Sequence, residues 1–389
     1  MRVLHYRQVF SKLSETFIYD RLTELERQGV DNHVVTRERT NAETRPFPSI
    51  TEVDWPKKWD PWRLASGIRY RLDPCRNGQE SYRQESYRRL AAVARGISAD
   101  VIHAHFGREG VFIAPVAERL GIPLVVTFYG YDISQLPRHP RWRESYERVW
   151  QTARAIVVLS EEMKRQAVRL GAPSDRVHVV HLARDLEDFS YRPPEGPVSE
   201  LISVGRLTEK KGHLDAIRAV QRVEAQGGNL RLRIVGEGPQ RDELEQYVQD
   251  HALQDTVELL GTRPNSEVGQ LLRRADAFML CSKTAASGDR EGTPTVLIEA
   301  QAVGLPCVST THAGIPEMMP EEAHPLLAPE GDVDALVNCI RRLRAASTEE
   351  RRRIAEAGRT KIENAFGLAT EAEKLRDLYR AVQKPAPVS

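Results

Sequence analysis

The chain lacks the features of a secreted or membrane-spanning protein. Its start, MRVLHYRQVF, contains no apolar signal-peptide core. No apolar run approaches the roughly 20 residues that span a bilayer, and Glu118 and Arg119 interrupt the best candidate. The 389 residues include only four cysteines, without a CxxC pair or the spacing of a metal site. We therefore predict a cytoplasmic protein with reduced thiols, at most peripheral on the inner membrane.

An excess of either charge is also lacking. The 56 basic residues nearly balance the 55 acidic ones. Proteins that bind nucleic acid usually carry a clear basic excess, so the composition does not indicate such a partner. The length suits two domains of ordinary size, each able to bury its own core.

Short apolar strands alternate with helices along the chain. In the first half, strands are predicted at residues 3–5, 32–36, 101–103, 124–128, 155–159 and 177–181. In the second half, they are predicted at residues 201–204, 230–235, 257–260, 277–281 and 306–309. This alternation predicts an α/β protein with doubly wound parallel sheets. Ligands bind such sheets beyond the carboxyl ends of the strands, so we expect one cleft lined by loops 8–14, 105–110, 129–132 and 160–161.

Residues 185–200, DLEDFSYRPPEGPVSE, interrupt this alternation. They are rich in proline and acidic residues and show no periodicity, as expected of a linker. We therefore place a first domain at residues 1–190 and a second at residues 191–365. Residues 366–389 form a separate C-terminal segment, whose first part has the pattern of a helix.

The stretch 290–317, REGTPTVLIEAQAVGLPCVSTTHAGIPE, has a strong helix signal. Thr293 is a good N-cap and Pro294 a good first residue, so a helix is predicted from Pro294 to about Val303. Gly304 is a suitable stop.

Two glutamates lie on this stretch, Glu291 before the helix and Glu299 inside it. The amides near Thr295 and Val296 would point out of the helix N-terminus, where a phosphate is stabilised. Glu299 lies one turn further along, about 6 Å away, which suits a ribose diol next to that phosphate. A capped amphipathic helix with two incidental carboxylates is the alternative interpretation.

The spacing of Glu291 and Glu299 resembles the E-x7-E signature of the retaining nucleotide-sugar glycosyltransferases of family four. GRLTEKKG, residues 205–212, resembles the GRL-x-x-x-KG motif of that family, and FSKLSETFI, residues 10–18, resembles the N-terminal loop of its exopolysaccharide-type members. The resemblance covers nearly the whole chain. It implies a GT-B fold, with two Rossmann-like domains facing a central cleft and a final helix that crosses back to the first domain.

The resemblance implies a donor site in the second domain. Arg206 and Lys211 would neutralise the donor diphosphate, whose negative charge grows as the sugar bond breaks. Glu299 would accept the ribose hydroxyls, and Glu291 would orient the sugar. The other residues expected to bind the donor are Gly236, Gly261, Gly292, Thr293, Pro294, Thr295 and Val296.

The family mechanism implies that an oxygen of the leaving phosphate deprotonates the acceptor, so no side-chain nucleophile is required. Neither a metal nor another cofactor is expected. The only D-x-D sequence, residues 332–334, lies at a predicted helix start far from the phosphate loops, and we interpret it as a cap.

On the acceptor side, the motifs HAHFG and VTFYGYD follow predicted strands. His103 has the pattern of a core residue, whereas His105 is the better functional candidate. Relatives often carry a histidine where this chain has Tyr129, and that histidine contacts the transferred sugar, so only a hydroxyl contact is predicted here. Asp132 is a candidate general base or, alternatively, a helix cap.

Ser14 and Glu15, in the SETF sequence, are predicted to contact the acceptor or to close over the donor. Capping of the next helix by Ser14 is the alternative.

Residues 57–95 carry ten basic and four acidic residues, with aromatic residues in or beside the run. This combination suits the headgroup region of an anionic membrane, and a solvated helical insertion explains it equally well.

The predicted function is a retaining hexosyltransferase. It would move a hexose from a UDP- or GDP-sugar to a glycan or a lipid-linked oligosaccharide in exopolysaccharide or O-antigen synthesis. The alternatives are an enzyme with a small soluble acceptor, as in sucrose or trehalose synthesis, a sugar-nucleotide epimerase and a non-catalytic scaffold subunit. The presence of Arg206, Lys211, Glu291 and Glu299 argues against a scaffold.

Overall fold

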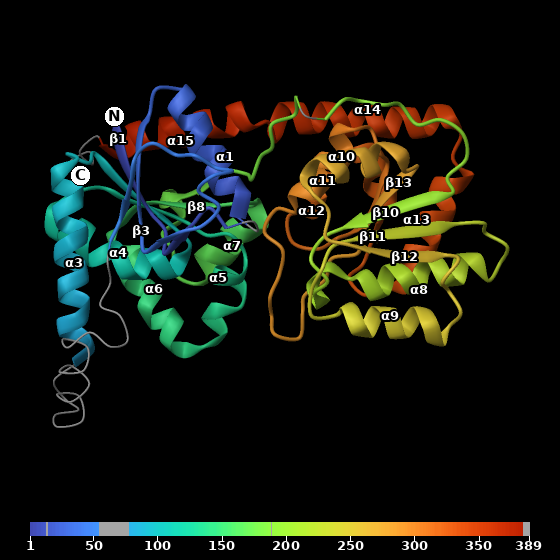
Figure 1. Ribbon diagram of the computed structural model, residues 1–389, viewed down its shortest axis with the longest axis horizontal. Helices are drawn as coiled ribbons and strands as arrows, with labels where there is room; N and C mark the ends of the chain where they lie inside the picture. The colour runs from blue at the N-terminus through green and yellow to red at the C-terminus, as the bar shows by residue number, and fades with distance from the viewer. Residues whose placement is uncertain (13–14, 54–77, 188, 384–389) are drawn as a thin grey trace.

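The structure is a computed structural model that describes residues 1–12, 15–53, 78–187 and 189–383. Figure 1 shows two α/β lobes side by side, with α14 and α15 running along the same side of both. The predicted strands agree with the observed ones to within two residues at each end. The prediction of doubly wound parallel sheets is therefore confirmed.

The first lobe contains a seven-stranded parallel sheet in the order β5-β3-β1-β6-β7-β8-β9. Its strands are β1 Arg2–Tyr6, β3 Asp31–Thr36, β5 Ile50–Glu52, β6 Val101–His105, β7 Leu124–Thr127, β8 Ala153–Val158 and β9 Val177–Val179. A short pair, β2 Val9–Phe10 and β4 Glu38–Arg39, lies beside it. Its helices are α1 Thr16–Arg27, α3 Gly78–Gly96, α4 Gly107–Leu120, α5 Tyr131–Ser134, α6 Pro140–Thr152 and α7 Glu161–Arg169, with 3₁₀ turns η2 Leu136–Arg138 and η3 Ser174–Arg176.

The second lobe contains a six-stranded parallel sheet in the order β12-β11-β10-β13-β14-β15. Its strands are β10 Glu200–Val204, β11 Arg231–Val235, β12 Val257–Gly261, β13 Ala277–Leu280, β14 Cys307–Thr310 and β15 Leu327–Ala328. Its helices are α8 His213–Glu224, α9 Arg241–Asp250, α10 Asn265–Arg274, α11 Thr295–Ala302, α12 Ile315–Met318, α13 Val333–Ala345 and α14 Thr348–Ala365, with 3₁₀ turns η4 Glu209–Lys211 and η5 Glu321–Leu326.

Continuous apolar strands explain why both sheets are covered on two faces. β7 (LVVT) and β13 (AFML) are buried at every position, as expected of central strands in a parallel sheet. Each sheet therefore presents only its strand ends to ligands.

The chain crosses between the lobes twice. The first crossing lies between β9 and β10, where the domain boundary was placed at residue 190; that boundary stays a prediction. The second joins α14 to α15 (Leu368–Gln383), which packs through Ala372, Leu375 and Tyr379 against the first sheet. Both crossings lie next to one another, because Arg184 forms a parallel bridge with Gly367.

The structure corrects the start of the helix predicted from Pro294. The helix is α11, and its N-cap is Pro294 instead of Thr293. The Thr293 hydroxyl donates to the Leu159 carbonyl, 3.0 Å away in the first lobe. Thr293 therefore joins the two lobes, and no side chain of the described residues caps α11.

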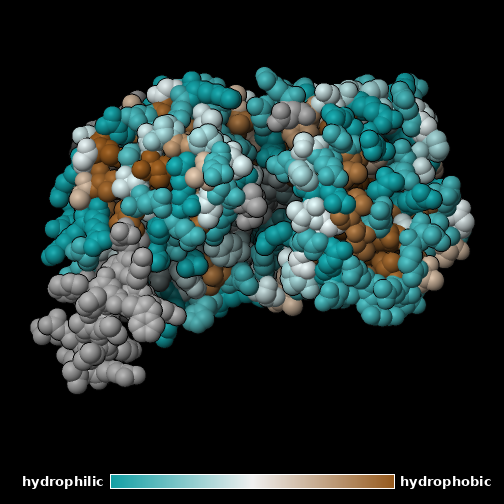
Figure 2. Space-filling view, viewed as in Figure 1, coloured by the Kyte–Doolittle hydropathy of each residue, from teal (hydrophilic) through white to brown (hydrophobic). Residues whose placement is uncertain are grey.

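Hydrophilic residues dominate the face in Figure 2, with apolar residues gathered in a band on the second lobe and in smaller groups on the first. No helix in the described ranges combines the length and the apolarity that crossing a bilayer requires. Most of the basic region 57–95 lies outside the described residues, so the predicted membrane contact stays untested.

Candidate active site

The strand ends of the two sheets meet across the space between the lobes. The backbone of Tyr129 and Gly130, after β7, packs directly on Glu291 and Gly292. A Cβ atom at Gly292 would lie 2.4 Å from the Tyr129 carbonyl oxygen, and one at Gly130, where φ is +136°, would lie 3.2 Å from the Gly292 nitrogen. Larger residues would push the lobes apart, so both glycines are required for this close approach.

Glu291 forms the centre of the site in the second lobe. The residue is only 6 % exposed, and its Oε1 lies 3.1 Å from Lys211 Nζ. Burial alone would raise the pKa of Glu291, but Lys211 and Lys210 outweigh it and hold that pKa at about 2. Glu291 is therefore a fixed negative charge at neutral pH and not a general acid.

His312 fixes the backbone at Glu291. The Glu291 amide donates to His312 Nε2 at 3.0 Å, which makes Nε2 the unprotonated nitrogen. His312 Nδ1 therefore carries the proton and donates to Glu330, 2.7 Å away. This chain of contacts was not predicted; the histidine in STTHAGIPE was the available signal.

The two predicted phosphate-binding cations follow β10. Lys211 lies at the end of η4, where Gly212 (φ +67°) comes so close to Cys281 that a Cβ would lie 1.8 Å from its carbonyl oxygen. Arg206 is exposed, and its guanidinium has no hydrogen-bond or ion-pair partner in the described part of the chain. The site therefore offers one partnered cation and one free cation.

Three glycines lie side by side at the ends of β10, β11 and β12. Gly205 donates to Val235, and Gly236 donates to Gly261. A Cβ at Gly236 (φ +146°) would lie 1.9 Å from the Gly205 carbonyl oxygen. A side chain at Gly236 would therefore clash with the strand end that precedes Arg206. The first amides of α11, at Thr295 and Val296, have no capping side chain and lie on the same lobe.

Glu299 lies inside α11, as predicted, and is 8 % exposed. Its Oε1 forms an ion pair of 2.7 Å with Arg184 Nη2. Burial raises the pKa of Glu299, and Arg184 opposes that rise. The carboxylate that we predicted to bind the ribose is thus already paired with Arg184. The spacing of the sequence could not reveal this partner.

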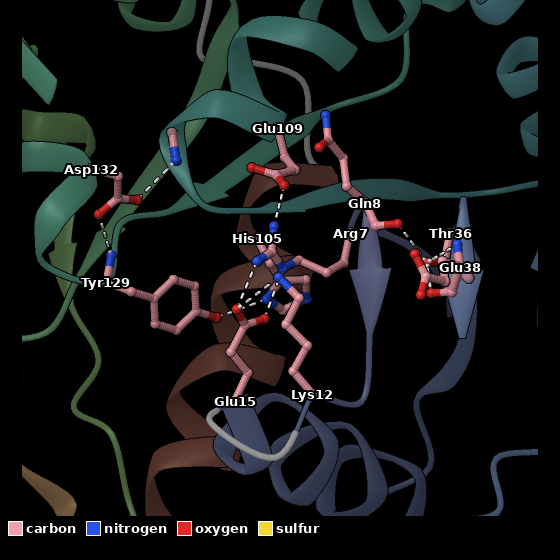
Figure 3. A network of polar contacts seen from close by, with 11 residues as sticks. Arg7, Gln8, Lys12, Glu15, Thr36, Glu38, His105, Glu109, Tyr129 and Asp132 are labelled. Carbon is pink, nitrogen blue, oxygen red and sulfur yellow. Dashed lines mark hydrogen bonds and ion pairs between the residues drawn. The ribbon is translucent and has the colours of Figure 1, made fainter. Parts of the chain in front are cut away.

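The acceptor side contains an ion-pair cluster that we did not predict (Figure 3). Arg7, just after β1, holds Glu15 through two bonds of 2.9 and 2.8 Å and also pairs with Glu109. Its guanidinium lies 4.2 Å from the centre of the Phe106 ring. Glu15 was predicted at this site, whereas Arg7 and Glu109 were not. Their positions after the ends of β1 and β6 were the sequence feature that could have indicated them. Ser14 lies outside the described residues.

A chain of buried hydrogen bonds determines the role of His105. Asn32 Nδ2 donates to two carbonyl groups, so its Oδ1 accepts from His5 Nε2 at 2.9 Å. His5 Nδ1 then accepts from His105 Nε2 at 3.1 Å, and His105 Nδ1 accepts from the Tyr129 hydroxyl at 2.7 Å. Burial lowers the pKa of both histidines, so both are neutral at pH 7.

His105 itself is 1 % exposed and has no free ring nitrogen. The prediction that it contacts substrate directly is therefore corrected: it orients Tyr129. His103 is a core residue, as predicted, and bonds Thr127 and Tyr379.

His5, His103 and His105 bring ring nitrogens within 4.8 Å of one another, a spacing that suits a metal ion. All six ring nitrogens already take part in hydrogen bonds, and the nearest charges are the cations Arg7 and Arg21. A metal ion here would add a further positive charge near these two arginines, which this environment does not favour. The absence of a metal requirement stays a prediction.

Asp132 is fully buried, and its carboxylate accepts from three backbone amides, those of Gly107, Tyr129 and Gly130, each at 2.9 Å. Burial raises its pKa to about 6, although these three bonds oppose the rise. With its oxygens engaged, Asp132 organises the backbone at the ends of β6 and β7. The N-cap residues of α4 and α5 are Phe106 and Gly130, and neither helix has a side-chain cap hydrogen bond from the described residues, so Asp132 is not an N-cap. Its role as a general base stays a prediction.

The predicted D-x-D cap is observed. Asp332 accepts from the Ala335 amide at 2.9 Å and caps α13, while Asp334 pairs with Arg222.

A contact between the lobes lies beside Glu291. Glu317, from the AGIPE sequence, accepts from the amides of Glu161 and Glu162 at 2.9 and 3.1 Å, and so caps α7 of the other lobe. Arg290 adds an ion pair of 2.8 Å with Glu162. The loop that carries Glu291 is thereby attached to the first lobe on both sides.

Replacing Glu317 by alanine should lower the free energy of unfolding by about 1 kcal/mol, the usual effect of removing a helix cap. Urea denaturation measures this change. Glu322→Ala is the matched control, because Glu322 is exposed and forms no ion pair in the described structure. Equal midpoints for both variants would show that the cap contributes nothing.

Comparison with known proteins agrees with this geometry. The profile of the family "Glycosyl transferase 4-like domain" matches residues 14–183, and that of "Glycosyl transferases group 1" matches residues 186–361. WcaL of Escherichia coli K12, assigned as a colanic acid biosynthesis glycosyltransferase, is 30 % identical over 408 residues, covering 98 % of this chain and 100 % of WcaL. The chain belongs to the group 1 glycosyltransferases.

Other similar proteins support this membership. The amylovoran biosynthesis glycosyltransferase AmsK of Erwinia amylovora is 34 % identical over 281 residues, covering 71 % of this glycosyltransferase and 69 % of AmsK. The crystal structure of HepE from Anabaena in complex with UDP matches with a TM-score of 0.77 at 18 % identity, covering 98 % of this chain and 100 % of HepE. At that identity the likeness shows the fold alone, which is GT-B.

Proposed function

We propose that this glycosyltransferase transfers a hexose, with retention of configuration, from a UDP- or GDP-sugar to a hydroxyl group of a glycan or a lipid-linked oligosaccharide in exopolysaccharide synthesis. The observation that carries the proposal is the buried Glu291–Lys211 pair next to the free cation Arg206 and the uncapped α11. The names of WcaL and AmsK support the polysaccharide pathway, and the UDP bound to HepE supports a nucleotide donor.

In this proposal the second lobe holds the leaving group. Arg206, Lys211 and the first amides of α11 stabilise the diphosphate as its negative charge grows. Glu291 is ionised at all working pH values, because its pKa is held at about 2, and accepts hydrogen bonds from sugar hydroxyls. Lys211 contacts Glu291 and thus ties the sugar position to the phosphate position.

The first lobe supplies the other wall. Tyr129 donates its hydroxyl proton inward to His105, and its backbone packs against Gly292 of the second lobe. Three amides bond the Asp132 carboxylate and Arg7 bonds Glu15, whereas Glu109 Oε2 has no hydrogen-bond partner among the described residues. In this proposal a phosphate oxygen of the leaving group takes the acceptor proton, as the family mechanism implies.

Nucleotide binding tests the proposal. We expect UDP or GDP to raise the thermal unfolding midpoint of the wild type, because a ligand at 100 times its dissociation constant stabilises by about 2.7 kcal/mol. Glu299→Ala should weaken the effect, since it removes the ribose carboxylate. The same protein should slowly hydrolyse the matching nucleotide-sugar, which liquid chromatography detects. Absence of both binding and hydrolysis with UDP-, GDP- and ADP-sugars would overturn the proposal and favour a scaffold.

A further inference from the structure

Arg184 lies where the two crossings between the lobes touch. Its amide donates to the Phe366 carbonyl at 3.3 Å, and its carbonyl accepts from the Leu368 amide at 3.1 Å. The linker after β9 is therefore bonded on both sides of Gly367, at the junction of α14 and α15. The backbone of Arg184 is thus held at the junction of the two crossings, which we call the hinge.

The side chain of Arg184 connects the lobes. Its Nη2 lies 2.7 Å from Glu299 Oε1 on α11, and its Nη1 lies 3.3 Å from Asp20 Oδ2 on α1. The Arg184 and Glu299 side chains are only 14 % and 11 % exposed, so solvent screens their pair weakly. Glu299 Oε2 has no hydrogen-bond partner within the described ranges, and so remains available to a ligand.

Space for a ligand exists next to this pair. An interlobe cavity of about 740 Å³ is lined by Arg184, by Asp20 and Tyr19 of α1, and by Asn265 and Gly269 of α10. Helix α10 follows β12, whose end carries Gly261 of the predicted donor site. The cavity therefore lies on the Arg184 side of the ion pair, between α1 of the first lobe and α10 of the second.

We propose that Arg184 is a positioning residue of the donor site, which binds Glu299 Oε1 from the hinge and so leaves Oε2 directed to the ribose of a nucleoside diphosphate. This inference rests on the proposed function and adds a residue to it. Asp20 holds the other end of the guanidinium, which restricts Arg184 to one orientation. Arginine suits this role because its rigid fork serves two carboxylates at once.

The charges around Glu299 give the proposal a measurable consequence. Arg184 is the cation that faces its carboxylate; Asp20 is the nearby anion, and Arg359 of α14 is bonded to the Ala302 carbonyl at the far end of α11. Burial and Asp20 both raise the pKa of Glu299, and Arg184 opposes them. Removing Arg184 leaves these two effects unopposed, so Glu299 should become protonated at a higher pH. Ribose binding to the ionised carboxylate should then be lost at a higher pH.

The experiment measures UDP and GDP affinity by calorimetry between pH 5 and 8 for the full-length wild type, Arg184→Met and Arg184→Lys. At pH 5 we expect Arg184→Met to bind the preferred nucleotide roughly ten- to a hundredfold more weakly than the wild type, the effect of losing a hydrogen bond to a charged group. At pH 8 the loss of affinity relative to the wild type should be smaller. Arg184→Lys retains the charge, so it should restore the pH profile. Arg273→Met is the matched control, because Arg273 lines the same cavity and should leave the profile unchanged.

Three results would overturn the proposal. Wild-type affinity and pH profile in Arg184→Met would leave Arg184 as a hinge contact alone. An equal loss at every pH, not restored by Arg184→Lys, would indicate a purely structural role. Failure of the wild type to bind any nucleotide would overturn the proposed function as well, and this outcome is distinct from the first two. The thermal midpoint of each variant shows whether it is folded. If Arg184→Met does not fold, Arg184→Lys still tests the proposal.

Discussion

Replacing Glu291 by glutamine should lower kcat/KM for glycosyl transfer by about 10²–10³-fold, the usual effect of removing one preorganised polar group from an active site. Glutamine keeps the shape of the side chain but removes its charge. The buried carboxylate is 3.1 Å from Lys211, so the charge fixes both the lysine and the sugar hydroxyls that it is proposed to accept. Initial rates with a saturating acceptor measure the loss.

Controls separate this effect from general damage. Nucleotide binding by Glu291→Gln should stay near that of the wild type, because the ribose is assigned to Glu299. Asp289→Asn is the matched variant: Asp289 lies in the same loop and pairs with the neighbouring Lys210 at 3.1 Å, yet it is not placed in the site. Similar rates for Glu291→Gln and Asp289→Asn would refute the central role of Glu291.

The pattern of the sequence was sufficient for the fold because parallel strands bury both faces. Strands such as β7 and β13 are apolar at nearly every position, and the glycines that follow the helices mark where each unit ends. The short edge strands β5 and β15 were missed, since only three and two residues pair there and edge strands carry a weak apolar signal. Local chemistry also placed Glu291 before α11 and Glu299 within it.

Contact beyond a single lobe explains what the sequence pattern missed at Thr293 and Glu299. Thr293 has the composition of a cap, but its hydroxyl bonds Leu159, which is 134 residues away in the chain. Glu299 has the spacing of a ribose ligand, but Arg184 reaches it from the hinge. Asp132 was left open between a base and a cap, because a position after a strand suits both; its three amide contacts within the first lobe could not be read from the sequence.

Replacing Lys211 by methionine should abolish transfer and also destabilise the second lobe by about 3–5 kcal/mol, because it leaves the Glu291 charge buried without its main partner. Urea unfolding at neutral pH measures the loss of stability. The double variant Lys211→Met/Glu291→Gln should recover most of that stability, since no buried charge remains, while it stays inactive. Recovery of activity in the double variant would contradict the proposed roles of both residues.

The pH dependence of stability gives the same prediction an independent check. In the wild type the pKa of Glu291 is held at about 2, below the 4.5 of an unperturbed glutamate. The pair therefore stabilises the folded state above the unfolded pKa, by about 3 kcal/mol, and this contribution is lost as the pH falls towards 2. In Lys211→Met the burial of Glu291 is opposed mainly by Lys210, so its folded-state pKa rises. If it rises above the unfolded value, stability is present at low pH and is lost as the pH increases. Unfolding curves between pH 2 and 8 should therefore show a smaller or inverted slope in Lys211→Met, whereas parallel curves for the two proteins over this whole range would refute the assigned pair.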